Sequence, residues 1–333
     1  MPAEWERHEA TWLAWPHADG VSFPGAYDKV LPVFAKIVDA LADSEEVRIC
    51  VNDAAEERAA LEILAPVRHD HVRFFHIPSN EPWCRDHGPI FVTRQQPPRL
   101  AAIDWGYNAW GFKYPPFDLD DAVPGRVASA LDIPVYSPDM VLEGGSIDVN
   151  GAGLLLSTES CLLNPNRNPE LSRKDIEKNL KHYLGGKRVI WLADGITGDD
   201  TDGHVDIVAR FVSATTILAA VEEDVDDDNH DSLRGNIDRL EQLAIEEASL
   251  RVEPLPMPSK ILKEGMRLPA SYANFYIANT VVLMPSFSDP NDKLAHAILS
   301  RHFPDREVLM IDSVELVWGL GSFHCLTQQQ PAV

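Results

Sequence analysis

Apolar and polar positions alternate along the chain in an order that is repeated several times. An apolar strand leads into a polar loop rich in Gly, Asp or Glu, and a β-hairpin and then a helix follow. Copies of this order run through residues 72–105, 133–186, 188–248 and 268–303, and a final segment spans 308–330. The pattern predicts an α/β protein built from similar strand, hairpin and helix modules.

The second copy carries the clearest local signals. Asn150 followed by Gly151 predicts a tight hairpin turn between two apolar strands. Residues 169–186 predict a helix, because Leu171, Ile176 and Leu180 fall on one face and two glycines close the segment.

Polar residues that could form a site recur in these loops at nearly equal intervals. The interval is 57 positions from Asp86 to Glu143, 61 from Glu143 to His204, and 121, close to two intervals, from His204 to Cys325. Five units fill the chain if one has its polar loop near Glu264. Modules that pack on their neighbours and close into a ring would bring these loops to one axis. An ordinary α/β sheet with coincidental spacing is the alternative.

The charge of the chain restricts its partners. The 333 residues include 29 Lys and Arg against 52 Asp and Glu, which gives a formal net charge of −23. Such a surface repels phosphate backbones and anionic lipids, so we expect no nucleic-acid or membrane partner. It attracts cationic ligands, although the same acidity could merely keep the protein soluble.

The N-terminal residues and the cysteines suggest a cytoplasmic protein with reduced thiols. Residues 1–17 lack a basic stretch followed by an apolar run. The four cysteines lie far apart without CxxC pairs, so the sequence predicts neither a disulfide framework nor a structural zinc site. They are Cys50, Cys84, Cys161 and Cys325.

Five residues in the repeated loops are candidates for chemistry. Cys325 lies in a glycine-containing segment close to the C-terminus, where a nucleophile would require the tail to be fixed in the core. His204 and Asp206 are expected at the start of a strand, where side chains two positions apart share one face. Asp86 and Glu143 precede glycines in loops. Each candidate also has a simpler interpretation. Cys325 could be a buried structural thiol, and His204 and Asp206 could be a metal-binding pair. Asp86 could belong to a salt-bridged loop, and Glu143 could be a turn residue.

Together these residues suit chemistry on a guanidinium group. A guanidinium is planar, permanently charged and rich in N–H donors, so paired carboxylates such as Asp86 and Asp206 match it. A Cys325 thiolate could attack the central carbon. His204 could then protonate the departing nitrogen and later activate water, oriented by Glu143. This chemistry requires no cofactor, and no further ligands appear at a spacing typical of a metal site.

The ordered set of motifs resembles the agmatine deiminase and bacterial peptidyl-arginine deiminase family of guanidino-group-modifying enzymes. The resemblance covers nearly the whole chain and rests on segments that include WCRDHGP, WGYNAWGFKYPPFDLDD, EGGSID, TDGHVD, LPASYANFYIAN and GSFHCLTQQQP. It implies a fivefold pseudosymmetric α/β propeller (pentein) of ββαβ-type modules, a single catalytic domain over residues 1–333, and a homodimer. It also implies metal-free catalysis by the matching residues, which are Cys325, His204, Asp86, Asp206 and Glu143.

One motif departs from the family pattern. The cysteine loop of the family usually reads Gly-Gly-Gly-Asn-Ile-His-Cys, whereas this chain has Leu320 and Phe323 at the second and fifth positions. The added bulk beside the nucleophile affects substrate specificity more than chemistry.

Agmatine is the substrate that the motifs favour. It carries a second positive charge and no carboxylate, and Trp83, Trp105 and Trp110 could contact its methylene chain, although each could equally belong to the core. Peptidyl-arginine and free arginine remain alternatives on the same chemistry. From other classes, a cysteine peptidase or amidase and a non-catalytic polyamine-binding protein also remain open.

Overall fold

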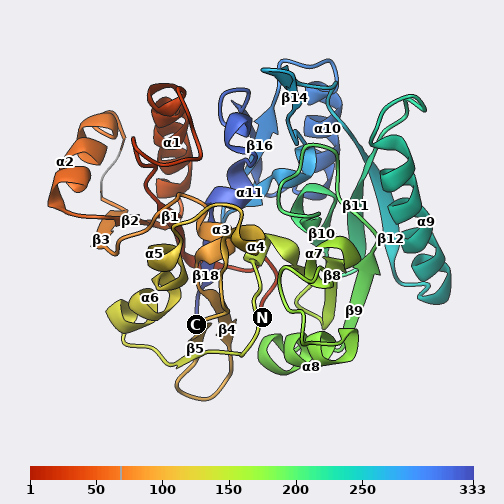
Figure 1. The fold of residues 1–333 in the computed structure, drawn as a ribbon, viewed down its shortest axis with the longest axis horizontal. Coiled ribbons are helices and arrows are strands. Elements are labelled where there is room, and N and C mark those ends of the chain that lie inside the picture. The colour runs from red at the N-terminus through yellow and green to blue at the C-terminus, as the bar shows by residue number, and fades with distance from the viewer. Residues whose placement is uncertain (68–69) are drawn as a thin grey trace.

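The computed structural model describes residues 1–67 and 70–333, and its strands form several small sheets (Figure 1). Within the described residues, five sheets share one pattern, in which an antiparallel pair of strands is extended by a parallel strand. They are β18-β1-β2-β3 (Gln328–Pro331, His8–Ala14, Glu46–Val51, Val72–His76), β4-β5-β6 (Ile90–Thr93, Leu100–Ile103, Val135–Tyr136), β7-β8-β9 (Asp148–Val149, Leu154–Thr158, Arg188–Leu192), β10-β11-β12 (Ala209–Ser213, Thr216–Val221, Arg251–Pro256) and β15-β16-β17 (Tyr276–Ile277, Val281–Ser286, Glu307–Asp312).

A helix precedes the parallel strand in each of the five sheets, as a crossover between parallel strands requires. These helices are α1 (Tyr27–Ala42), α6 (Val123–Leu131), α8 (Arg173–Leu184), α9 (His230–Glu246) and α10 (Asp292–His302). A further helix, α2 (Ala54–Ile63), joins β2 to β3. The mixed α/β class and the repeated order predicted from the sequence are therefore confirmed.

Short helical turns lie in the loops that connect the modules, and Figure 1 shows α3, α4 and α11 near the middle of the view. The longer helices α2, α8 and α9 lie at its rim. The short turns are α3 (Cys84–His87), α4 (Ala109–Phe112), α5 (Asp118–Asp121), α7 (Glu159–Leu162), α11 (Phe323–Leu326), η1 (Gly144–Ser146), η2 (Val205–Ile207), η3 (Tyr272–Asn274) and η4 (Val317–Gly319).

The local signals of the second copy are confirmed. Gly151 has a φ of +68° in the turn between β7 and β8, a conformation that favours glycine. Helix α8 begins with a capping box formed by Ser172 and Asp175, and Gly185 ends it with a φ of +73°. Ile176 and Leu180 are buried on its inner face.

Two expectations about loops were wrong. His204 and Asp206 do not start a strand, because His204 caps the 3₁₀ turn η2, Asp206 lies inside it, and β10 begins only at Ala209. In the unit expected to have its polar loop near Glu264, the polar residue just before the hairpin β15-β16 is instead Asn274, in η3. Glu264 is the exposed turn of a two-stranded hairpin, β13 (Leu262–Lys263) with β14 (Met266–Arg267).

The C-terminal tail is fixed, as expected for a segment that carries a nucleophile. Strand β18 pairs antiparallel with β1, and Gln330 accepts hydrogen bonds from Trp12 Nε1 (3.0 Å) and Arg48 Nη1 (2.6 Å). Phe323 and Leu326, on either side of Cys325, are fully buried in the largest apolar cluster. This packing holds α11 in place.

Among the described residues, no helix is both long enough and apolar enough to cross a lipid bilayer.

Candidate active site

Four short turns from different modules bring the candidate residues together. Asp86 lies in α3 and Cys325 in α11. Glu143 directly precedes η1, while His204 precedes η2 and Asp206 lies inside it. The Sγ atom of Cys325 lies 3.6 Å from Oδ2 of Asp206. The Nδ1 atom of His204 lies 3.6 Å from Oδ1 of Asp86. Residues as far apart as positions 86 and 325 thus form one buried cluster.

Gly145, in η1, explains how these side chains approach so closely. A Cβ atom at this position would lie 2.6 Å from His204 Nδ1, 2.7 Å from Asp86 Oδ1 and 3.0 Å from Asp206 Oδ2. The backbone N–H of Gly145 donates to Asp86 Oδ1 at 3.0 Å. Only glycine fits here without displacing the cluster.

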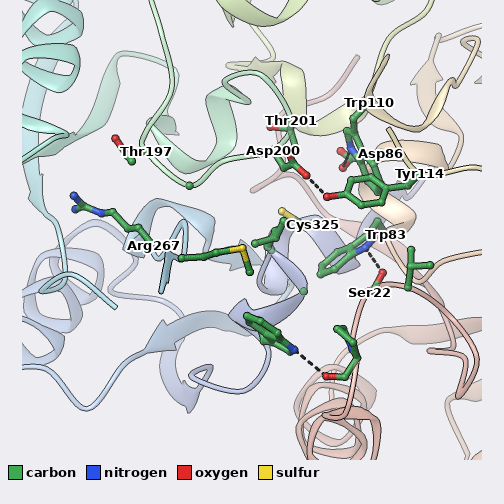
Figure 2. A pocket seen from close by; sticks show the side chains of 18 residues that line it. Ser22, Trp83, Asp86, Trp110, Tyr114, Thr197, Asp200, Thr201, Arg267 and Cys325 are labelled. Atoms are coloured by element: carbon green, nitrogen blue, oxygen red, sulfur yellow. Dashed lines mark hydrogen bonds between the residues drawn. The ribbon is translucent and has the colours of Figure 1, made fainter. Parts of the chain in front are cut away.

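A cavity of about 470 Å³ opens onto this cluster, and Figure 2 shows side chains that line it. Asp86 and Cys325 line the cavity, as do Trp83 and Trp110. His204, Asp206 and Glu143 are buried and do not line it, although the first two contact lining residues. The cavity is therefore walled by aromatic side chains with a carboxylate and a thiol at its inner part.

The three tryptophans have different positions. Trp110 Nε1 donates to Asp86 Oδ2 at 3.0 Å, and Trp83 Nε1 donates to Ser22 Oγ at 2.8 Å. Trp105 is the exception, because it lies outside the cavity lining and packs in an apolar cluster with its ring 5.6 Å from that of Tyr183. Its expected contact with substrate is corrected accordingly, and Trp105 is a core residue.

The two site aspartates differ in their electrostatic environment. Burial, together with the charges of Asp206 and Glu143, raises the pKa of Asp86, although His204 and Trp110 oppose this. Burial also acts to raise the pKa of Asp206, but the hydrogen bond and charge of His324 outweigh it and the pKa is lowered. Asp206 is thus an ionised acceptor, and its Oδ1 atom is buried without a hydrogen-bond partner.

Cys325 is held by a residue that the sequence did not mark. Asn274 Nδ2 donates to Cys325 Sγ at 3.1 Å, while its Oδ1 accepts from the backbone N–H of Ser322 at 3.1 Å. Burial and the charges of Asp206 and Asp86 raise the pKa of the Cys325 thiol well above its usual value. This environment favours the protonated thiol over the thiolate.

Asn274 lies at the end of η3. It is the polar loop residue of the module for which the regular spacing of the loops had predicted a position near Glu264. It is 70 positions after His204 and 51 before Cys325, and an insertion that includes the β13–β14 hairpin accounts for the unequal spacing. A stricter search for polar residues directly before each hairpin would have found Asn274.

Glu143 lies beside His204 without a direct hydrogen bond. Its Oε1 atom is 2.5 Å from Arg167 Nε, while its Oε2 atom and both ring nitrogens of His204 are buried without a partner. Burial acts to lower the pKa of His204, but the charges of Asp86, Glu143 and other carboxylates outweigh it and the pKa is raised. This environment favours an imidazolium.

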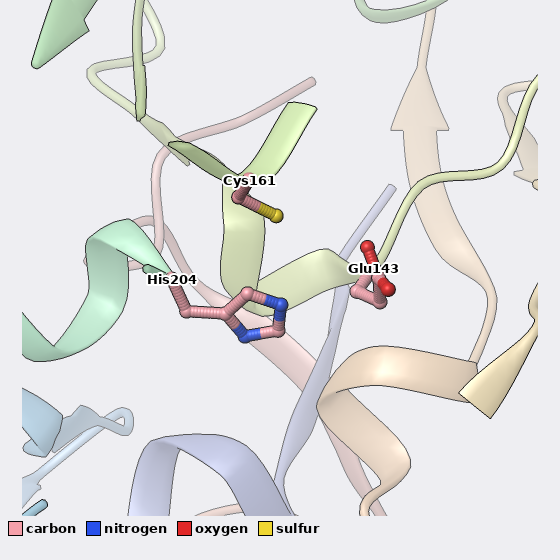
Figure 3. A group of neighbouring side chains, drawn as sticks. All are labelled: Glu143, Cys161 and His204. Carbon is pink, nitrogen blue, oxygen red and sulfur yellow. The ribbon is translucent and has the colours of Figure 1, made fainter. Parts of the chain in front are cut away.

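The side chains of Glu143, Cys161 and His204 also form a group whose ligand-type atoms lie within 4.8 Å of one another (Figure 3). These residue types can bind zinc. However, the fully buried guanidinium of Arg167 already pairs with Glu143, and a positive charge at this distance opposes a second cation. The arrangement fits support of His204 better than a metal centre.

A second carboxylate in the cavity lining was also missed by the sequence reading. Asp200 accepts a hydrogen bond from the Tyr114 hydroxyl (Figure 2), and its side chain is 40% exposed. Its Oδ1 atom also lies 4.0 Å from Lys113 Nζ. The residue stands in the DDTDGH run, but only the fold shows that it lines the cavity, whereas Asp199 and Asp202 do not.

Comparison with known proteins decides the family. The model of the Porphyromonas-type peptidyl-arginine deiminases matches residues 1–331. The chain belongs to this family. Agmatine deiminase of Medicago truncatula is 40% identical to this chain, and the match covers 100% of this chain and 96% of the relative. Agmatine deiminase of Pseudomonas aeruginosa is 38% identical, and the match covers 100% of this chain and 95% of the relative. A structure of C. jejuni agmatine deiminase with substrate bound is 31% identical, with a TM-score of 0.90, covering 99% of this chain and 95% of its own. The resemblance inferred from the motifs is confirmed.

Proposed function

We propose that this peptidyl-arginine deiminase family member hydrolyses the guanidinium group of agmatine to N-carbamoylputrescine and ammonia. The observation that carries the proposal is the contact between the Cys325 thiol and Asp206, beside a cavity that also exposes Asp86. Its relatives in Medicago truncatula and Pseudomonas aeruginosa carry the name agmatine deiminase, which supports the same reaction here.

The guanidinium binds between the two site aspartates. Asp206 offers Oδ1, which lacks a partner, and Asp86 offers a carboxylate that otherwise accepts from Trp110 and Gly145. Buried carboxylates gain from a bound cation, because the free site leaves their negative charges close together. The planar cation then lies next to Cys325.

The reaction proceeds in two halves. In the first, the positive charge of the substrate or of His204 favours loss of the Cys325 thiol proton to solvent, and the resulting thiolate forms a bond to the guanidinium carbon. His204 donates a proton to the departing nitrogen, the C–N bond breaks and ammonia leaves, to be protonated in solvent. In the second, neutral His204 takes a proton from water, which attacks the thiouronium adduct, and the C–S bond breaks to release the ureido product and the free thiol. Glu143 stabilises the charged form of His204 that starts the first half and is formed again in the second.

The remaining lining favours agmatine over free arginine. Asp200 offers a carboxylate for the second ammonium of agmatine. The guanidinium of Arg267, a cation in the same lining, is held by Asp227 at 2.7 Å and is only 6% exposed. It is therefore poorly placed to bind the carboxylate of arginine.

The alternatives are separated by one assay. The purified protein is incubated with agmatine, free arginine and an arginyl peptide, with and without a chelator, and ammonia and ureido product are followed. We expect turnover of agmatine that the chelator leaves unchanged. Faster turnover of the peptide would favour peptidyl-arginine as the substrate. Cleavage of a peptide bond would indicate a peptidase or amidase. Binding of agmatine without any product would indicate a polyamine-binding protein.

We also propose how the chain is organised around this site. The five sheets are arranged as a fivefold pseudosymmetric propeller, and residues 1–333 form a single catalytic domain. The protein acts in the cytoplasm as a homodimer, without nucleic-acid partners. The shared strand pattern of the sheets and the acidic net charge of −23 support these proposals. Light scattering of the purified protein tests the dimer, and a single cooperative unfolding transition tests the single domain.

A further inference from the structure

The residue before the nucleophile, His324, lies between two buried carboxylates. Its Nδ1 atom is 2.7 Å from Asp206 Oδ2, and its Nε2 atom is 2.9 Å from Glu4 Oε2. The three side chains are at most 4% exposed. An ionised carboxylate can only accept hydrogen bonds, so each ring nitrogen must donate. The geometry therefore requires a doubly protonated, positively charged ring.

The charges around Glu4 support this assignment. Glu4 also pairs with Arg210 at 2.9 Å and with Arg85 at 3.2 Å, so it holds its negative charge without taking the proton of His324. Burial acts to raise the pKa of Glu4, but Arg210, His324 and Arg85 outweigh it and the pKa lies well below its usual value.

The charge count of the network balances only if His324 is charged. Arg210 also pairs with Asp148 at 3.3 Å, which closes the network. Three carboxylates then face three cations, and a neutral His324 would leave one buried negative charge uncompensated, which is costly. The six groups are Glu4, Asp148, Asp206, Arg85, Arg210 and His324.

The arrangement divides the two oxygens of Asp206 between different tasks. Oδ2 accepts from His324 and contacts Cys325 Sγ at 3.6 Å. Oδ1 is buried and has no partner. A carboxylate held by one oxygen cannot rotate freely, so its second oxygen keeps a fixed position and an unused capacity to accept hydrogen bonds.

We propose that Glu4 and His324 act as a positioning pair, in which the charged ring of His324 holds Asp206 by Oδ2, keeps it ionised and leaves Oδ1 for the guanidinium. This inference rests on the proposed function for its substrate. Glu4 is 202 positions before Asp206 in the sequence, and its carboxylate accepts hydrogen bonds from Arg85, Arg210, His324 and the backbone N–H of Ile277. These four residues do not line the cavity, and of the four, His324 is the one that hydrogen-bonds to Asp206.

Kinetics of Glu4→Gln test the pair, because this change removes one charge and keeps the shape. The charged groups facing His324 are Glu4 and Asp206, with Arg85 and Arg210 beyond Glu4. Without the Glu4 carboxylate, the ring loses one of its two ionic partners, and Asp206 is less well held as an anion. We expect kcat/KM for agmatine to fall about 100-fold. In a plot of kcat/KM against pH, the acidic limb should shift upward by about one pH unit, because Asp206 then takes a proton at higher pH.

Two control variants separate positioning from folding. Asp148→Asn removes another buried carboxylate that pairs with Arg210 but does not contact His324, and it should leave the acidic limb in place. Glu4→Asp keeps the charge and should restore the wild-type limb in part. Equal shifts in Glu4→Gln and Asp148→Asn, at comparable melting temperatures, would overturn the proposal.

Nitrogen-15 NMR of the histidine rings tests the charge of His324 without substrate, with His324→Gln used to assign its signals. We expect both ring nitrogens of the wild type to carry a proton, as their contacts with two carboxylates require, and the Nε2 signal to change in Glu4→Gln, which removes the carboxylate facing that nitrogen. A neutral ring in the wild type would reject the pair. A wild type that fails to turn over agmatine would instead reject the proposed function, and the NMR result would still stand on its own.

Discussion

The Sγ atom of Cys325 lies 3.6 Å from Oδ2 of Asp206, a residue 119 positions earlier in the chain. The contact places a thiol against an anion, which is the opposite of the environment that makes a cysteine reactive by itself. A positive charge close to the sulfur, on His204 or on the bound substrate, therefore has to offset this anion before the sulfur becomes a good nucleophile. A guanidinium substrate supplies that charge.

Replacing the nucleophile should abolish turnover while leaving binding. We expect Cys325→Ser to lower kcat for agmatine by at least about 1,000-fold, because a serine hydroxyl cannot replace the thiolate. Mass spectrometry of the quenched reaction should find an adduct on the wild type and none on the variant. Cys50→Ala, in buried β2, is the control and should retain kcat. Turnover by Cys325→Ser at the wild-type rate would contradict the covalent mechanism.

The raised pKa of Cys325 predicts slow alkylation in the free protein. Because the thiol is protonated below its pKa, the thiolate fraction and the rate with iodoacetamide should increase as the pH is raised from 7 to 10, as followed on the Cys325 peptide by mass spectrometry. Asp206→Asn removes a charge that raises this pKa, so alkylation at pH 8 should become faster. Asp148→Asn should have little effect. A rate independent of pH would show that the sulfur is already ionised.

Asp200 should determine affinity for the second charge of agmatine. We expect Asp200→Asn to raise KM for agmatine about tenfold with little change in kcat, since the carboxylate is remote from the reacting carbon. The KM for butylguanidine, which lacks the ammonium, should not change. Asp231→Asn, at a fully exposed position in α9, serves as the control. Equal effects on both substrates would place Asp200 in a structural role.

Leu320 combines an unfavourable backbone with a position in the cavity wall. Its φ is +68°, which a residue with a side chain adopts at a cost, and the residue lines the cavity, whereas Phe323 is buried in the core. Two variants separate these effects. Leu320→Gly should be more stable than Leu320→Ala by about 0.5–1 kcal/mol in denaturant unfolding, because only glycine relieves the strain.

The same two variants test the effect of Leu320 on specificity. Both remove the bulk beyond Cβ, so both should accept a bulkier guanidino compound such as an arginyl amide about tenfold better relative to agmatine. If neither variant changes this ratio, Leu320 does not restrict the cavity.

The sequence by itself determined the module order, the family and most of the chemical groups. The hairpin turn at Asn150-Gly151 and the extent of helix α8 depend on neighbouring residues, so both can be predicted from the sequence without knowledge of the fold. The types of residue at Cys325, His204, Asp86 and Asp206 identified guanidinium chemistry because few other reactions use a thiol, an imidazole and paired acids together.

Only the tertiary structure decided which groups meet. Trp105 and Trp110 lie in one motif, yet one packs in the core and the other donates to Asp86, because a left-handed turn at Ala109–Phe112 changes the direction of the chain. Asn274 lies in the LPASYANFYIAN segment that supports the family resemblance, but neither it nor Glu4 was a candidate site residue in the sequence. Their roles arise from contacts across distant modules, since hydrogen bonds and buried charges depend on distances that residue order does not encode.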